Sequence, residues 1–108
     1  KSRVETLCQS SGADYTIDWS LSGLPYQTGE GELIGAVIGA VESVTNDPPS
    51  LSTDGGTSDG RFIAPTGAQV IELGPINRTI HRIDEQVNLH DLDLLSEIYE
   101  NMLIRLLS

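Results

Sequence analysis

The chain has 108 residues, the length of one small domain or of part of a larger one. Hydrophobic residues make up 38% of it, which is enough for a folded core and too much for a disordered tail. The 16 acidic residues outnumber the 6 basic ones, and the formal net charge is −10. Because such a surface repels phosphate backbones, we expect no nucleic-acid partner.

Cysteine usage and apolar runs indicate the compartment. Cys8 is the one cysteine, so no disulfide can form within the chain, and we expect a reducing, cytoplasmic compartment. Cys8 suits a small apolar position in a helix better than the role of a nucleophile. The longest apolar run, 36–41, is interrupted by Gly39 and is far shorter than the ~20 residues of a membrane span, so no membrane partner is expected. The start at Lys1, in mid-pattern, is typical of a processed product or a fragment.

The first twenty residues predict a helix followed by a strand. Residues 1–10 carry apolar side chains on one helical face, and Gly12 is placed to end the helix in a left-handed conformation. Residues 13–20 alternate, and one face of the predicted strand carries Tyr15, Ile17 and Trp19. We therefore expect a half-buried strand behind a short helix.

The middle of the chain predicts a loop over 21–31 and a helix over 32–45. The helix has an apolar stripe that consists of Leu33, Val37, Ala40, Val41 and Val44. Gly35 and Gly39 lower its intrinsic stability, and we expect close packing against a neighbour to compensate. Pro48 and Pro49 then stiffen the following loop.

The second half predicts two short strands and two helices. We expect strands over 51–53 and 69–73, with a short helix over 59–63 between them. Asn88 is a favourable N-cap for a helix that runs to Leu107. Its apolar stripe, which we expect to be core, consists of Leu92, Leu95, Ile98, Tyr99, Met102, Leu103 and Leu106. Because strands alternate with helices, the predicted fold class is α/β, a sheet with flanking helices.

The turn at 53–59 is a candidate anion site. Its sequence, Thr-Asp-Gly-Gly-Thr-Ser-Asp, lies between a predicted strand and a predicted helix start. Glycines let backbone N–H groups approach a ligand closely, and a helix start favours a carboxylate or phosphate. The alternative is an ordinary capped turn with Ser58 or Asp59 as the N-cap. The pattern lacks the Gly-Lys-Ser/Thr of a P-loop.

The loop after Gly74-Pro75 presents a candidate metal ligand, His81. Loops at the carboxyl ends of strands in α/β proteins are where sites form, and a neutral imidazole is a common zinc ligand. Asp84 or Glu85 is placed to fix the imidazole tautomer. The alternative is a surface histidine. A catalytic zinc needs three protein ligands, and His81 and His90 alone do not supply them.

Three motifs carry a resemblance to a known family. They are Gly-Gly-Thr-Ser-Asp-Gly-Arg-Phe at 55–62, Glu-Leu-Gly-Pro at 72–75, and Asn-x-Thr-Ile-His at 77–81. Together with Asp-Trp-Ser-Leu-Ser-Gly at 18–23, they resemble the C-terminal part of the bacterial succinyl-diaminopimelate desuccinylase family. These are di-zinc amidohydrolases related to aminoacylase and to glutamate carboxypeptidases. The resemblance covers all 108 residues but only about the last third of such an enzyme.

The resemblance implies a zinc-dependent hydrolysis of N-succinyl-L,L-diaminopimelate to succinate and L,L-diaminopimelate, a step of lysine and cell-wall precursor biosynthesis. Two zinc ions and a general-base glutamate serve the reaction. His81 falls on the last zinc ligand of the family. Ser22, Gly56, Thr57 and Asn77 fall on positions that line the substrate pocket. The other ligands and the base belong to a part of the family sequence that lies before this chain.

The resemblance also divides the chain into two parts and implies a homodimer. Residues 1–21 correspond to the end of an inserted dimerisation (lid) domain, and residues 22–108 to the C-terminal segment of the catalytic domain. We therefore expect the chain alone to be inactive, to bind zinc weakly and to expose apolar surface through which it self-associates. Two alternatives stay open: a related deacylase such as an acetylornithine deacetylase, and a non-catalytic self-associating domain.

Overall fold

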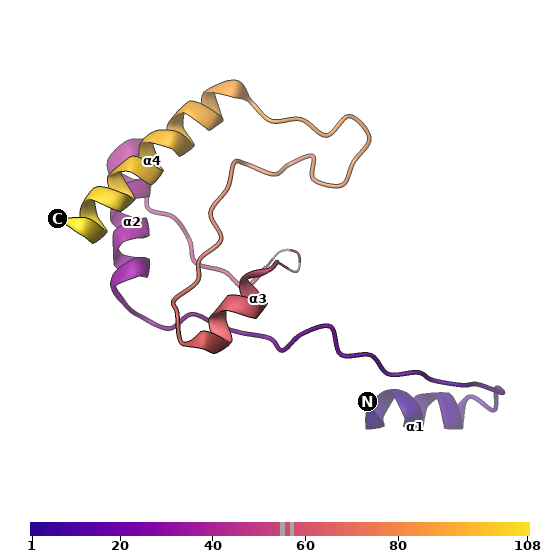
Figure 1. The fold of residues 1–108 in the computed structure, drawn as a ribbon. Coiled ribbons are helices and arrows are strands. Elements are labelled where there is room, and N and C mark those ends of the chain that lie inside the picture. Colours follow the sequence, from indigo (N-terminus) through magenta and orange to yellow (C-terminus); the bar gives the residue numbers. More distant parts are fainter. Residues whose placement is uncertain (55, 57) are drawn as a thin grey trace.

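The computed structural model describes residues 1–54, 56 and 58–108 (Figure 1). Its helices, in chain order, are α1 (Ser2–Ser10), α2 (Glu32–Thr45), α3 (Gly60–Ile63), a short 3-10 helix η1 (Ala64–Thr66) and α4 (Leu89–Leu107). The helices predicted at the N-terminus, in the middle and at the C-terminus are confirmed, with bounds that agree to within one or two residues. The predicted short helix is also confirmed, and it begins at Gly60 rather than Asp59.

The predicted strands are wrong for the residues that the structure describes. The runs 13–20, 51–53 and 69–73 have no regular secondary structure, so the sheet of the expected α/β fold does not form from these residues. A strand needs a neighbouring segment to pair its backbone N–H and C=O groups. One side chain partly takes that role: Thr28 Oγ1 donates to the carbonyl oxygen of Val70 and accepts the Val70 N–H at 3.2 Å.

The core lies where α2 and α4 pack against each other (Figure 1). Its buried side chains are Val37, Ala40, Val41 and Ile98, with Leu33, Val44, Ile71, Leu73 and Met102 packed around them. The predicted close packing is confirmed at Gly39, where a built Cβ would lie 2.8 Å from the Arg105 side chain, but it is wrong at Gly35, which is exposed with nothing within 4 Å. Tyr99 also ties α4 to the extended run before Gly74, because its hydroxyl donates to the Leu73 carbonyl oxygen at 2.8 Å.

The ends of α2 are set by residues far apart in sequence. Gly31 is the N-cap and has no side chain to accept a bond, so Gln69 Oε1 accepts the Leu33 N–H at 3.0 Å instead. The helix ends at Asn46, whose backbone is left-handed with a φ of 57°. Since Gln69 holds the first turn of α2, the segment before Val70 is fixed against this helix.

The first twenty residues form a separate pair of segments beside the rest of the chain (Figure 1). The helix α1 ends before Gly12, which has the predicted left-handed backbone, with a φ of 69°. The extended run that follows returns along α1, where the Trp19 indole Nε1 donates to Glu5 Oε1 at 3.0 Å. Lys1 Nζ lies 5.5 Å from the centre of the Trp19 ring. The Tyr15 hydroxyl also donates to the Glu5 carbonyl oxygen at 3.5 Å. Tyr15 and Trp19, the first and last residues of the predicted apolar face, therefore both contact α1.

The chain as a whole is open. Its radius of gyration is 19.3 Å, whereas a compact protein of this length has about 13 Å. The apolar stripe of α4 consequently supplies only part of the core that its pattern predicts, namely Ile98 with Met102 beside it. Within the described part of that helix only Ile98 is buried, while Leu103 is 50% exposed.

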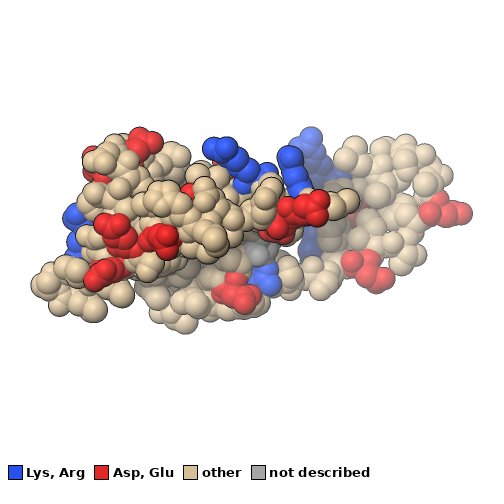
Figure 2. All heavy atoms as spheres, turned by 90° about the horizontal axis from the view of Figure 1, so that it is seen from above, with Lys and Arg blue, Asp and Glu red and all other residues tan. Residues whose placement is uncertain are grey.

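Acidic side chains are spread over the visible surface (Figure 2). Figure 2 shows Asp and Glu side chains distributed along the whole visible face rather than gathered in one block. Among the helices of the described residues, none has the length and apolar character that a membrane span requires.

Candidate functional site

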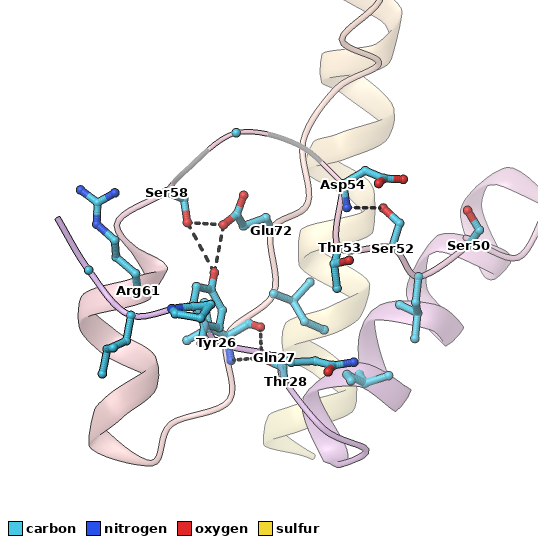
Figure 3. A pocket seen from close by; sticks show the side chains of 18 of the residues that line it. Tyr26, Gln27, Thr28, Ser50, Ser52, Thr53, Asp54, Ser58, Arg61 and Glu72 are labelled. Carbon is cyan, nitrogen blue, oxygen red and sulfur yellow. Dashed lines mark hydrogen bonds between the residues drawn. The ribbon is translucent and has the colours of Figure 1, made fainter. Parts of the chain in front are cut away.

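An open groove of about 1070 Å³ lies between α2 and α3 and contains two of the predicted substrate residues (Figure 3). Its walls come from the loop at 22–28, from residues 50–54, 56 and 58, and from the run 70–72. Ser22 and Gly56 both line it. The predicted substrate residue Thr57 lies outside the described residues. Two predicted positions 34 residues apart in sequence thus share one hollow, although their contacts with a ligand remain a prediction.

A cluster of three polar side chains holds one wall of this groove (Figure 3). The Tyr26 hydroxyl donates to Glu72 Oε1 at 3.0 Å, and the Ser58 hydroxyl donates to the same oxygen. The Tyr26 and Ser58 oxygens are 3.4 Å apart. Hydrogen bonds to an ionised carboxylate are stronger than bonds between neutral groups. One carboxylate oxygen therefore joins three segments that are distant in sequence.

Ser58 also caps the start of α3, the role that the alternative interpretation of the turn gives to Ser58 or Asp59. Its Oγ accepts the Gly60 N–H at 3.1 Å, whereas Asp59 makes no side-chain cap bond. Because this oxygen is the acceptor in its hydrogen bond with the Gly60 N–H, the Ser58 hydroxyl can donate its own hydrogen to Glu72. The turn is thus both a capped helix start and a wall of the groove, and the two interpretations are compatible.

The loop that carries Asn77 and His81 lies elsewhere. Figure 1 shows the stretch between Gly74 and α4 extending away from α3, and neither residue lines the groove. Thr79 closes this loop on itself, because its hydroxyl donates to the Gln86 carbonyl oxygen at 2.9 Å and accepts the Gln86 N–H at 3.0 Å. His81 is exposed and has a left-handed backbone with a φ of 60°, which residues other than glycine seldom adopt.

The described residues do not assemble a metal site by themselves. No group of three or more His, Cys, Asp and Glu side chains within the ranges 1–54, 56 and 58–108 is placed to hold a metal ion. His81 is exposed on a loop that the hydrogen bonds of Thr79 hold closed.

Arg61 is a further groove residue that the sequence pattern did not single out. Its side chain packs so closely on Gly23 that a Cβ there would lie 2.6 Å from Arg61 Cδ. Its guanidinium lies 4.7 Å from the centre of the Phe62 ring, and its buried Nε has no hydrogen-bond partner among the described residues. Tyr26 and Glu72 were missed as well. The one local signal for Arg61 and Glu72 is that each stands inside a family motif.

The chain belongs to Peptidase family M20/M25/M40, whose model it matches over residues 3–105. Among its relatives, the succinyl-diaminopimelate desuccinylase of Alkalilimnicola ehrlichii is 63% identical over 105 residues, which are 97% of this chain and 28% of that protein. The enzyme of the same name from Pseudoalteromonas atlantica is 58% identical over 98% of this chain and 28% of its own length. That from Acinetobacter baumannii is 56% identical over all 108 residues and 29% of its length.

These comparisons confirm the predicted resemblance. They also fit the predicted origin in a peptidase-type catalytic domain. The chain spans less than a third of the length of the curated relatives it matches. What those whole enzymes do is therefore a proposal for this chain.

Proposed function

We propose that this chain is part of a zinc-dependent amidohydrolase that hydrolyses N-succinyl-L,L-diaminopimelate to succinate and L,L-diaminopimelate. The observation that carries the proposal is the 63% identity with a succinyl-diaminopimelate desuccinylase over 97% of the chain. The proposed compartment is the cytoplasm, and the proposed assembly is a homodimer. The proposed division of the chain is a dimerisation insert over 1–21 and a catalytic segment over 22–108.

The groove supplies the proposed contacts with substrate. Ser22 and Gly56 line it, and with Thr57 and Asn77 they are the proposed substrate-binding residues. The substrate carries several carboxylates, which backbone N–H groups and hydroxyls bind well. The proposed role of Gly56 is to let the backbone approach a substrate carboxylate, because glycine has no Cβ in the way. Ser22 would add a hydroxyl donor from the facing loop.

His81 is the proposed metal ligand of this chain. Its exposed imidazole and its unusual backbone conformation support the assignment, since strained residues concentrate at functional sites. Zinc bound there would polarise the amide carbonyl and lower the pKa of a water molecule. Two ions are proposed for the whole enzyme, with the remaining ligands and the general-base glutamate from sequence beyond this chain. The chain alone should therefore be inactive and bind zinc weakly.

The test uses the intact polypeptide, meaning this chain with all the flanking sequence that its gene encodes. We expect His81→Ala to lower kcat/KM for N-succinyl-L,L-diaminopimelate by at least about 100-fold and to reduce the amount of bound zinc, because a side chain that binds zinc directly is lost. His90→Ala is the matched control, since its exposed side chain makes no contact that the proposal uses. Hydrolysis rates and zinc content are measured side by side for the three proteins.

The outcomes separate the alternatives. Full activity in His81→Ala would return His81 to the role of a surface residue. An intact polypeptide that hydrolyses N-acetylornithine in preference to the succinylated substrate would support the related deacylase. Activity on neither substrate, in a protein that still self-associates, would support the non-catalytic assembly domain.

A further inference from the structure

We propose that Glu72 is a positioning residue, which acts through Ser58 and Tyr26 to fix the groove wall that carries Gly56. This inference rests on the proposed function, since it assigns to Glu72 the order of the substrate-binding turn. Glu72 itself lines the groove, but the proposal assigns it no contact with the substrate. Its carboxylate instead accepts hydroxyl protons from both neighbours on a single oxygen, Oε1.

Two hydrogen bonds hold the Ser58 hydroxyl in place. This residue stands two positions after Gly56 and two positions before Gly60, the first residue of α3. Its Oγ accepts the Gly60 N–H at 3.1 Å and donates to Glu72, so its hydroxyl is held from two sides. With the hydroxyl fixed in this way, the C-terminal end of the turn is pinned to the run 70–72.

The Glu72 carboxylate is itself held in place by contacts between the two segments around it. Thr28 Oγ1 bonds both backbone groups of Val70, and Tyr26 lies two residues before Thr28. The loop that carries Tyr26 is thereby fixed to the run that carries Glu72, and the bond between their side chains, at 3.0 Å, adds to the same joint. Figure 3 shows the three side chains converging on one side of the groove.

The absence of a side chain at Gly60 leaves space for Tyr26 to contact Glu72. Gly60 is buried, and a Cβ on it would lie 2.3 Å from the Tyr26 hydroxyl oxygen. Tyr26 therefore reaches Glu72 only because position 60 has no side chain. A glycine, a tyrosine, a serine and a glutamate from three segments meet at one point, which is the arrangement expected of groups that set a wall before a ligand arrives.

The test is steady-state kinetics of the intact polypeptide on N-succinyl-L,L-diaminopimelate. We expect Glu72→Gln to raise KM roughly 10-fold with a smaller change in kcat, because a bond to a charged acceptor is lost and the turn is less ordered before binding. Tyr26→Phe removes one of the two donors and should raise KM by a smaller factor. Glu100→Gln is the control, because Glu100 is exposed on α4 and remote from the groove.

A double-mutant cycle separates positioning from general stability. If Tyr26 acts through Glu72, the Glu72→Gln/Tyr26→Phe double variant should have nearly the same KM as Glu72→Gln alone. A role in overall stability alone would lower the active fraction, and hence apparent kcat, with KM unchanged. Tyr26→Phe keeps the carboxylate and the ring, so it provides the kinetic comparison if Glu72→Gln does not fold.

The possible results decide both proposals. A wild-type polypeptide that does not hydrolyse the substrate would refute the proposed function and this inference with it. An active wild type with an unchanged KM in Glu72→Gln and Tyr26→Phe would refute the inference alone. A raised KM in both, with non-additive effects in the double variant, would support the positioning role.

Discussion

Gly60 is the residue at which a single missing carbon shapes the groove. A Cβ built there would lie 2.3 Å from the Tyr26 hydroxyl oxygen and 2.9 Å from Val70 Cγ1. Real contacts of that kind do not occur, so the tyrosine ring or the Val70 run would have to move. We expect Gly60→Ala to destabilise the intact polypeptide by about 1–3 kcal/mol, measured by urea unfolding.

Gly35→Ala is the matched comparison for this prediction. Gly35 is an exposed helical glycine in α2 with nothing within 4 Å of the built Cβ. Because alanine has the higher helix propensity, this variant should be stabilised by about 0.5–1 kcal/mol. Equal effects of the two substitutions would mean that Tyr26 does not pack on Gly60 as the structure describes.

At the residue scale, the sequence predicts positions better than it predicts contacts. Ser22 and Gly56 were identified by motif, and they line the same groove. Glu72 and Tyr26 were not, since their bond joins residues 46 apart in sequence and no local pattern contains it. Asn77 and His81 keep their proposed roles, although the structure places their loop away from the groove (Figure 1).

At the element scale, the cap of α4 is a local feature that the sequence predicted correctly. Asn88 Oδ1 accepts the His90 N–H at 3.0 Å, and the Asn88 backbone is extended, as an N-cap requires. We expect Asn88→Ala to cost about 1 kcal/mol of unfolding free energy, because one of the first N–H groups of the helix loses its partner. Chemical denaturation followed by circular dichroism measures it.

Asn88→Ser is the variant that tests the mechanism. Serine caps a helix nearly as well as asparagine, so it should retain most of the stability that alanine loses. A loss as large for serine as for alanine would show that Asn88 stabilises the chain through some contact other than the cap.

Helices and strands differ here for a physical reason. A helix bonds within its own sequence, so the periodicity predicts α2 and α4, and only the first turn of α2 takes its cap bond from a distant residue, Gln69. A strand bonds to another segment, and periodicity says nothing about whether that segment is present. The alternating run 13–20 is extended and packs on α1 by its side chains, but it has no strand partner in the described part of the chain.

At the scale of the whole molecule, the solvent-accessible surface area is larger than that of a compact monomer of the same mass. The accessible area is 8844 Å², whereas a compact monomer of 11.6 kDa has about 5800 Å². Much of the excess is apolar, since large side chains of α4 such as Leu103, Ile104 and Leu107 are at least half exposed. The predicted exposure of apolar surface is thus confirmed, and an apolar face of this kind favours association.

Self-association of the isolated chain is the consequence to test, and a second copy is the partner that is always available to it. We expect sedimentation velocity to show a mass that rises with concentration, and Leu103→Asp to weaken the association by about 10-fold or more, because a charge replaces a half-buried apolar contact. Ser96→Asp, which adds the same charge at an exposed polar position of α4, should leave the mass distribution unchanged. A single monomeric species at every concentration would contradict the expectation. Association that Leu103→Asp does not weaken would place the contact away from α4.

In the intact polypeptide the same substitution distinguishes between two possible partners of the apolar face of α4. If it is covered within the folded enzyme, Leu103→Asp should lower stability; if it forms the contact between subunits, the substitution should shift the dimer equilibrium instead.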